Sequence, residues 1–496
     1  MYVASSLQMK KYDVRLLEEG YTIETLVDKA SDCLLTHCTS YENIVIVSGT
    51  GNNGADGVSL AIKLHELKKQ VTLLLIGNLD NLSQANQYYL SIAKEKDIEI
   101  LYVKEMAEVI EQVLSKADVI VDAIFGFGLH SNPSGIFADM ITCINIIKEK
   151  TVMSVDIPTG LDCDTGIPYE NIIIANTTIT LTALKQGFLN PASKKYTGEV
   201  LVEVLATNDF RQEQGIAKLV NDTWIQNHLK SRDYYGHKGN YGKVLHITGC
   251  DQYKGASLLS AKASVYSGSG IVSVCSTKSV LQNLNIFVPE ATSFIREDTL
   301  DYSISNRYNA ILVGCGLGIS KNSFSYVKEL LLYSTVPLVI DADALTIVAE
   351  YKQLLKEYQG GIILTPHMGE FKRFIPSLQE NDIIDTAREF AREYGIILVL
   401  KGANTLITDG ETVIRNNTGN PAMSTAGMGD VLAGMIVSFV GQGYSLYDAA
   451  ILATYIHGKC GDMLAKDSYT ALPSKIVEEI PKVMHSINNN LSIKIE

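Results

Sequence analysis

The stretch IVIVSGTGNNGADG, residues 44–57, runs from an apolar strand through a glycine-rich turn into a helix. Similar β-branched runs follow at residues 71–77 (VTLLLIG), 98–103 (IEILYV) and 118–126 (DVIVDAIFG), separated by amphipathic or polar segments. This alternation is typical of βαβ units, in which consecutive strands are parallel. We therefore expect an open, doubly wound, Rossmann-like α/β sheet in the first half of the chain.

A second series of strand-like runs begins near residue 243 and does not repeat the first. Its members are KVLHITG (243–249), GIVSVCS (270–276), NAILVGCG (309–316), PLVIDAD (337–343), GIILTPH (361–367) and IILVLKG (396–402). Two helices, expected at residues 430–440 and 446–464, close the series. A chain of 496 residues exceeds what one hydrophobic core usually serves. Because the polar segment 208–223 separates the two series, we expect two α/β domains, at residues 1–212 and 213–496.

The composition is that of a soluble globular enzyme, with 46% apolar and 20% charged residues. A formal net charge of −13 argues against nucleic acid as a partner, because an acidic surface repels polyanions. The eight cysteines form no C-x-x-C pair and no cluster at zinc spacing, so we expect neither disulfides nor a transition-metal site. No signal-peptide pattern and no bilayer-spanning apolar run is present. We expect a cytoplasmic protein without a membrane partner. The sequence leaves open whether the chain forms a homo-oligomer.

Three polar loops follow strands of the first series. They carry Asn53, then Asp122, then Asp156 and Thr159. Strand carboxyl ends meet in one crevice of an open α/β sheet, so these side chains are expected to converge on one ligand. Each carboxylate alone would more often cap a helix or bind a loop amide. Together they form an all-oxygen set, which suits a hard cation.

The ordered motifs GTGNNGADG, DAIFGFG and SVDIPTGLD, with Met9 and Asp13 in the leader, resemble the NAD(P)H-hydrate epimerase domain over essentially the whole first half. The resemblance implies interconversion of the R and S epimers of hydrated NADH and NADPH (NADHX and NADPHX) at the hydroxylated ring carbon. It also implies a K⁺ ion held by Asn53, Asp122 and Thr159, with Asp156 as the acid/base catalyst. The residues implied to bind the substrate are Asn52, Asn53, Gly54, Ala55, Asp56, Gly126, Phe127, Gly128, Leu129, His130, Ser131, Asn132 and Asp156.

One position departs from that family pattern. Some relatives carry a Lys in the loop where this chain has His130, so we assign His130 no catalytic role. A loop histidine exposed to solvent is the simpler interpretation, although histidine can exchange protons near neutral pH.

The segment NTGNPAMSTAGMGD, residues 417–430, is the strongest motif of the second half, and the helix VLAGMIVSFV follows it. A glycine-rich loop at a helix N-terminus binds anions and can stabilise a phosphoryl group during its transfer. Asp430 stands where it could take a proton from a substrate hydroxyl, although a helix-capping role is the alternative. Lys401 could balance phosphate charge, while Asn404 and Thr405 could donate hydrogen bonds to phosphate or ribose.

The motifs HKGNYGKVLHITG, VGCGLG, DADAL, LTPHMGE, KGANTLI and TAGMGDVLAG resemble the ribokinase-like superfamily, and within it the ADP-dependent NAD(P)H-hydrate dehydratases. The resemblance implies that Asp430 deprotonates the ring hydroxyl, which becomes phosphorylated so that phosphate, a better leaving group than hydroxide, departs. ADP as the donor is implied by the fused arrangement of bacterial relatives, and Mg²⁺ by phosphoryl transfer in general. The implied substrate contacts are Ala256, Gly316, His367 and Asp430, and the implied nucleotide contacts are Lys401, Gly402, Ala403, Asn404, Thr405 and Gly429.

Two other functions stay open from the sequence. The second half could be an ATP-dependent kinase of a hydroxymethyl vitamin precursor, because one fold hosts many reactions. The first half could be a binding module without catalysis. The presence of both motif sets in one chain favours an epimerase that supplies a dehydratase, since spontaneous hydration gives both epimers and the dehydratase takes one.

Overall fold

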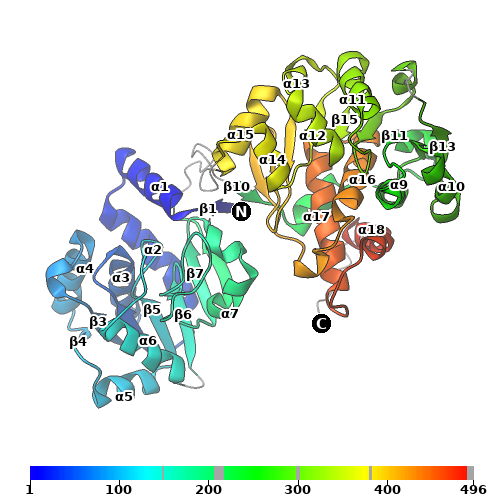
Figure 1. Cartoon of the computed structure of the whole chain (residues 1–496). Helices are drawn as coiled ribbons and strands as arrows, with labels where there is room; N and C mark the ends of the chain where they lie inside the picture. The colour runs from blue at the N-terminus through cyan, green and yellow to red at the C-terminus, as the bar shows by residue number, and fades with distance from the viewer. Residues whose placement is uncertain (148–149, 206–216, 298–301, 379–382, 489–496) are drawn as a thin grey trace. The chain divides into compact units, whose positions relative to one another are not determined.

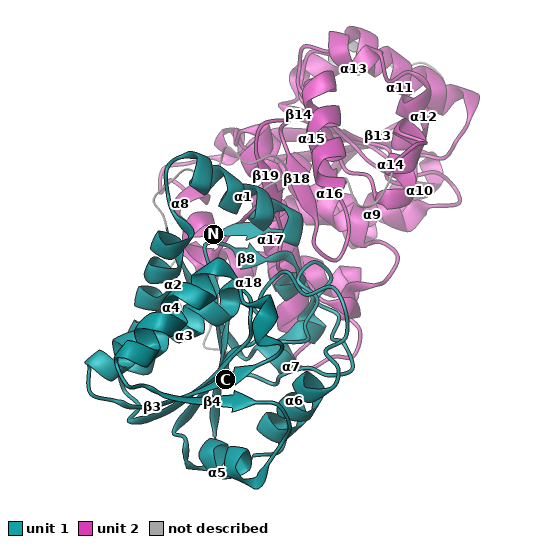
Figure 2. Cartoon of the chain, turned by 90° about the vertical axis from the view of Figure 1, so that its left-hand side faces the viewer, with its two compact units in different colours: residues 1–216 teal, residues 217–496 magenta. Residues whose placement is uncertain are grey.

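A computed structural model describes residues 1–147, 150–205, 217–297, 302–378 and 383–488 (Figure 1). The chain divides into unit 1, residues 1–216, and unit 2, residues 217–496, which Figure 2 colours separately. The expected boundary between residues 212 and 213 lies outside the described residues.

Unit 1 contains a seven-stranded sheet in which every described pairing is parallel. In sheet order its strands are β4 (Glu99–Val103), β3 (Gln70–Ile76), β2 (Asn43–Ser48), β5 (Val119–Ala123), β6 (Thr151–Val155), β7 (Thr177–Leu181) and β9 (Glu199–Glu203). The chain runs outward in one direction from β2 to β4 and in the other from β5 to β9. This reversal between β2 and β5 confirms the doubly wound sheet and marks the edge where ligands bind.

The alternation of side chains along β2 explains the layers of unit 1. Ile44 and Ile46 pack against α2 (Ile23–Cys38), α3 (Asn52–Glu66) and α4 (Gln84–Glu95). Val45 and Val47 face the other side, where α5 (Glu108–Lys116) and α6 (Ile136–Ile146) pack. Successive strand residues point to opposite faces, and both faces are covered by helices, so residues 44–47 of the strand are all apolar.

Helix α1 (Ser6–Glu18) has a packing cluster of its own in unit 1, following β1 (Tyr2–Ala4). Ser5 and Gln8 form a capping box at its start, which satisfies two free backbone N–H groups. Met9, Tyr12 and Leu16 then pack together with Ala183, just before β8 (Leu184–Lys185). This packing fixes the face of α1 from which Asp13 projects.

Unit 2 is built on a larger sheet. Its strands, in sheet order, are β13 (Thr292–Ile295), β12 (Ile271–Ser276), β11 (Lys243–Ile247), β14 (Ala310–Val313), β15 (Leu338–Ile340), β16 (Ile362–Leu364), β17 (Ile397–Leu400), β18 (Leu406–Thr408), β19 (Val413–Arg415) and β10 (Ala217–Leu219). The strands from β13 to β17 are parallel, whereas β17, β18 and β19 pair antiparallel.

Helices cover both faces of the unit 2 sheet. On one face α9 (Lys254–Tyr266), α16 (Met428–Gly441), α17 (Leu446–Leu464) and α18 (Pro473–Asn488) pack on residues such as Val244. On the other face α11 (Lys321–Tyr333), α12 (Asp343–Glu350), α14 (Met368–Phe374) and α15 (Ile383–Tyr394) pack on residues such as Leu245. No helix in the described part of the chain is long and apolar enough to cross a membrane.

The predicted closing helices are confirmed as α16 and α17, but they do not end the unit. Helix α18 follows them and was not predicted, because its sequence is largely polar and contains Pro481. Its spaced apolar residues Ile476, Ile480 and Val483 are nevertheless buried against the same face. Strand β10 and helix α8 (Asp222–His228) also precede residue 243, where the second strand series was expected to begin.

Candidate active sites

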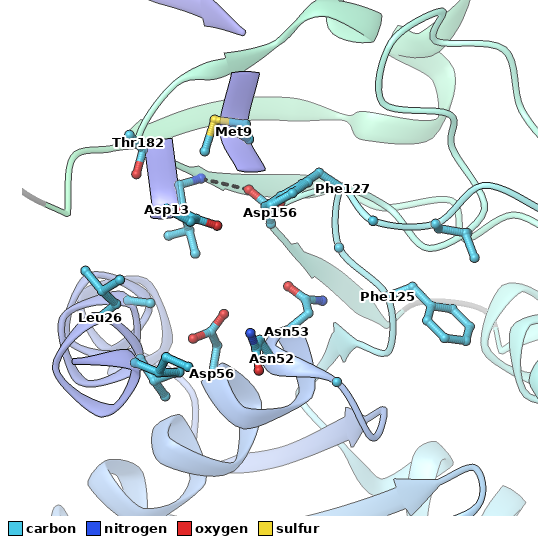
Figure 3. A pocket seen from close by; sticks show the side chains of 18 of the residues that line it. Met9, Asp13, Leu26, Asn52, Asn53, Asp56, Phe125, Phe127, Asp156 and Thr182 are labelled. Atoms are coloured by element: carbon cyan, nitrogen blue, oxygen red, sulfur yellow. Dashed lines mark hydrogen bonds between the residues drawn. The ribbon is translucent and has the colours of Figure 1, made fainter. Parts of the chain in front are cut away.

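A cavity of about 700 Å³ opens in unit 1 at the carboxyl ends of β2, β5 and β6 (Figure 3). This is the edge at which the sequence predicted that polar loops converge. The predicted substrate-binding residues that line it are Asn52, Asn53, Asp56, Gly126, Phe127, Gly128, Leu129, His130, Ser131 and Asp156. Leu16, Leu26 and Val27 add apolar walls from α1 and α2, which the sequence analysis did not identify.

Three predicted substrate-binding residues lie beside the cavity rather than on its surface. Gly54 and Ala55 are buried, and a Cβ on Gly54 would stand 2.0 Å from the Gly49 carbonyl oxygen. Gly54 therefore lets α3 begin against the end of β2. Asn132 is exposed, and its Oδ1 accepts a 3.0 Å hydrogen bond from the backbone N–H of Asn171.

Asp156 enters the cavity directly after β6 with a backbone φ of 65°, which side-chain-bearing residues rarely adopt. Its Oδ1 lies 2.6 Å from the Nζ of Lys185, whose side chain is 0% exposed. The same Nζ donates hydrogen bonds to the carbonyl oxygens of Leu181 and Ala183 and to the Thr180 hydroxyl. A buried ammonium with four oxygen partners thus stabilises the carboxylate that faces the cavity.

Lys185 was missed by the sequence analysis. The available signal was a single lysine following the apolar run TTITLTAL, in a position where a lysine is costly to bury without a partner.

Two further carboxyl groups, of Asp13 and Asp56, line the same cavity. Burial, together with the nearby charge of Asp156, raises the pKa of Asp13 to about 6. Burial raises the pKa of Asp56 well above its usual value, and the charges of Asp156 and Asp13 add to that shift. The cavity therefore combines an aspartate that is paired with a buried lysine and two carboxyl groups whose pKa is raised.

The predicted cation ligands surround the start of the loop after β5. Asp122 is fully buried and accepts hydrogen bonds from the Thr159 hydroxyl (2.7 Å), the Thr159 backbone N–H (2.9 Å) and the Ser154 hydroxyl (2.8 Å). The Thr159 hydroxyl also accepts from the Phe125 N–H, and Asn53 packs against the adjacent Gly126. Burial raises the pKa of Asp122, although the Thr159 bonds oppose this shift. These partners are neutral, so a cation would fit by balancing the buried charge.

His130 lies on the cavity rim, where its Nε2 is 3.3 Å from the Nζ of Lys10 in an exposed pair.

The second site lies in unit 2 at the N-terminus of α16. Gly427 caps this helix with a φ of 98°, which glycine adopts without strain. Asp430 lies in the first turn. Burial, followed by the charge of Asp341, raises the pKa of Asp430 to about 7. A carboxyl group with this pKa can accept a proton near neutral pH.

Asp341, directly after β15, forms an ion pair with Lys401, directly after β17. Asp341 Oδ1 is 2.7 Å from Lys401 Nζ and accepts a 2.7 Å hydrogen bond from the Thr365 hydroxyl. Burial alone would raise the pKa of Asp341, but Lys401 lowers it below its usual value. The Cys315 Sγ and carboxylate oxygens of Asp341 and Asp430 lie within 4.8 Å of one another. Asp341 and Cys315 were not predicted, although the motifs DADAL and VGCGLG contain them.

The predicted nucleotide-binding residues lie on the loop after β17 and at the start of α16. A Cβ on Gly429 would stand 3.2 Å from the Nζ of Lys401, so the structure brings these two residues together. Thr405 donates a 3.1 Å hydrogen bond from its hydroxyl to the Gly402 carbonyl oxygen. This bond closes a turn that leaves Gly402 and Ala403 exposed.

Apart from Asp430, the predicted substrate contacts of unit 2 fall in two places. Gly316 has a φ of 59°, and a Cβ there would stand 2.9 Å from the Cβ of Ala256, so these two residues are adjacent. His367 caps α14, where its Nδ1 accepts from the N–H groups of Gly369 and Glu370. Its side chain remains 59% exposed, and its backbone pairs with Lys401.

Comparisons with known proteins agree with the two-unit architecture. A family described as NAD(P)H-hydrate dehydratase matches residues 244–482, and one described as the YjeF-related protein N-terminus matches residues 22–187. The bifunctional NAD(P)H-hydrate repair enzyme of Moorella thermoacetica is 30% identical over 99% of this chain and 98% of its own. The enzyme of the same name from Thermofilum pendens is 30% identical over 100% and 98%.

One solved structure supports the fold of unit 2. A ribokinase-like superfamily protein from Enterococcus faecalis is 29% identical, with a TM-score of 0.51, and the match covers 55% of this chain and 97% of that one. The expected ribokinase-like fold is thereby confirmed.

Proposed function

The chain belongs to the family of bifunctional NAD(P)H-hydrate repair enzymes, and from this premise we propose how its two units divide the work. Residues 1–212 form the epimerase domain, which interconverts the R and S hydrates of NADH and NADPH. Residues 213–496 form the dehydratase domain, which returns the S hydrate to NADH or NADPH with ADP as phosphoryl donor, giving AMP and phosphate.

In the dehydratase domain Asp430 acts as the general base. It takes the proton of the ring hydroxyl, whose oxygen then attacks the terminal phosphoryl group of the nucleotide. The backbone N–H groups of Gly427–Gly429 stabilise the charge on that group, and Lys401 binds the nucleotide phosphates. The ring nitrogen then expels phosphate. Mg²⁺ bound to the nucleotide would neutralise phosphate charge, and we assign it no protein ligand.

Ala256 and Gly316 contact the hydrate in this proposal, and His367 lies at the edge of its binding site. Gly402, Ala403, Asn404 and Thr405 form the nucleotide loop. Support for this loop comes from its position next to Lys401 and from its two exposed residues.

In the epimerase domain Asp156 is the catalytic acid/base group, and the loops at residues 52–56 and 126–132 hold the substrate. Asn53, Asp122 and Thr159 would hold K⁺, which would supply positive charge beside the substrate phosphates. The fit rests on the buried Asp122 carboxylate, whose described hydrogen-bond partners are all neutral.

The observation that carries the proposal is Asp430, whose pKa of about 7 suits a base, in the first turn of a glycine-capped helix beside Lys401. The test is to incubate the full chain with mixed R and S hydrates of NADH and to follow the dihydronicotinamide absorbance. ADP, ATP and no nucleotide are compared.

Full conversion of both epimers with ADP is expected. Asp430→Asn should lower dehydration about 10²- to 10⁴-fold, the usual contribution of a general base. Asp156→Asn should convert the S form at the normal rate and the R form slowly. An absence of nucleotide-dependent recovery would overturn the dehydratase assignment and favour a vitamin-precursor kinase.

A further inference from the structure

The epimerase cavity contains a further carboxyl group, that of Asp56, to which the proposed function gives no part in proton transfer. Asp56 is 9% exposed and lines the cavity. Its carboxyl group accepts no hydrogen bond within the described residues, and no ion pair holds it. A carboxyl group that lines a cavity without a protein partner is available to contact a ligand bound there.

Asp56 and Asp156 approach the cavity from different elements. Asp56 comes from the N-terminal part of α3, whereas Asp156 follows β6. Figure 3 shows Asp156 and Asp13 on one side of the open space and Asp56 on the other. The two groups are close enough for the charge of Asp156 to raise the pKa of Asp56. A ring bound between them would present one face to each carboxyl group.

Inversion at the hydroxylated carbon requires proton transfer on both faces of the ring. When the hydroxyl leaves from one face, it must receive a proton, and the nitrogen lone pair forms a double bond to the carbon. When water adds to the opposite face, it must lose a proton. One acid and one base on opposite sides of the ring satisfy both requirements.

We propose that Asp56 is a second catalytic residue of the epimerase domain and acts with Asp156 across the ring. Starting from the epimer whose hydroxyl faces Asp56, protonated Asp56 gives its proton to that hydroxyl, and the C–O bond breaks to release water. A second water adds to the opposite face while the Asp156 carboxylate takes its proton. The reverse reaction uses protonated Asp156 and ionised Asp56, so atoms and charges balance in both directions.

The surrounding charges fit these starting states. The Nζ of Lys185 lies 2.6 Å from Asp156, whereas no cation pairs with Asp56 in the described residues. The negative charges of Asp156 and Asp13 both raise the pKa of Asp56, because like charges close together disfavour ionisation. The charge of Asp13 therefore acts on the ionisation of Asp56.

The inference rests on the proposed epimerase activity, so wild-type protein is measured first with purified R hydrate and no ADP. Absence of R-to-S conversion by the wild type would contradict the proposed function itself. If conversion occurs, Asp56→Asn is compared with Asp139→Asn, an exposed carboxylate on α6. We expect kcat to fall about 10²-fold or more in Asp56→Asn, with a smaller change in KM, and to stay unchanged in Asp139→Asn.

Two further measurements separate catalysis from folding and from binding. Urea unfolding followed by circular dichroism should give the same unit 1 transition in Asp56→Asn as in the wild type, which shows that unit 1 is folded, whereas conversion of S hydrate with ADP would report only on unit 2. Wild-type reactions in ¹⁸O-water should place one solvent oxygen in each epimerised product, above an enzyme-free control. A rise in KM with normal kcat in Asp56→Asn, or retention of the original oxygen by the wild type, would overturn the inference.

Discussion

The two units contain the same buried ion pair in opposite orientations. In unit 1 the Lys185 side chain is 0% exposed and the Asp156 side chain 7%, whereas in unit 2 the Asp341 side chain is 2% exposed and the Lys401 side chain 19%. Unit 1 therefore hides the cation and presents a carboxylate to its cavity. Unit 2 hides the carboxylate and presents an ammonium, as a site for phosphate requires. The buried member of each pair stabilises the charge that meets the ligand.

The largest expected effect comes from removing the hidden cation of unit 1. Lys185→Met leaves Asp156 without its counter-charge, so the free energy of unfolding of unit 1 should fall by about 3–5 kcal/mol. Urea unfolding of the full chain would show this as an earlier transition in circular dichroism. Trp224, the sole tryptophan, lies in unit 2, so its fluorescence midpoint should not move.

The matched control is Lys104→Met, an exposed lysine of unit 1. It should change the free energy of unfolding by no more than about 0.5 kcal/mol. Equal effects of the two substitutions would show that the buried pair does not stabilise unit 1.

Removal of the presented cation of unit 2 should weaken nucleotide binding, and it should also lower the stability of unit 2 because it leaves the buried Asp341 without its counter-charge. Lys401→Met loses a charge-assisted hydrogen bond to phosphate, worth about 1.5–3 kcal/mol, so KM for the nucleotide should rise about 10- to 100-fold. The exposed Lys466→Met serves as the control in steady-state assays with varied ADP. An unchanged KM for Lys401→Met would contradict the idea that the lysine is presented to a ligand.

A smaller effect should appear in the pH dependence of the dehydratase. Its base must be ionised, and the pKa of Asp430 is raised to about 7, so kcat/KM should increase as pH rises through about 7. Asp341→Asn removes a negative charge that contributes to this shift, so the midpoint should move to lower pH. A pH–rate profile between about pH 5 and 9 measures both. The same midpoint in both proteins would contradict this coupling.

Much of the fold could be predicted because strand and helix patterns are local. The apolar runs of β2, β5 and β6 and the helices α16 and α17 were expected from spacing and turn residues alone. Strands β13, β18 and β19, of three or four residues, were missed, whereas the equally short β15 and β16 were expected from the apolar runs at residues 337–343 and 361–367. Helix α18 was missed because most of its residues are polar and its apolar residues lie only on the one face that packs against the unit.

The site residues that lie within recognisable sequence motifs could be predicted. Asn53, Asp56, Asp156 and the 126–131 loop meet around one cavity as expected, because parallel strands end at a common edge. Lys185 and Asp341 were missed for a different reason: each acts through a partner far away in sequence. Asp156 and Lys185 are 29 positions apart in the sequence with β7 between them, and only the folded structure shows that their side chains meet.

The burial of Lys185 also determines its chemical reactivity. An amine reacts with an acylating reagent only when its uncharged form contacts that reagent. The Lys185 side chain has no exposed surface, so the reagent cannot contact it in the folded protein. Acylation of Lys185 must therefore wait for unit 1 to open. The extent of labelling at this one lysine, read by peptide mass spectrometry, would report how often the epimerase cavity comes apart under native conditions.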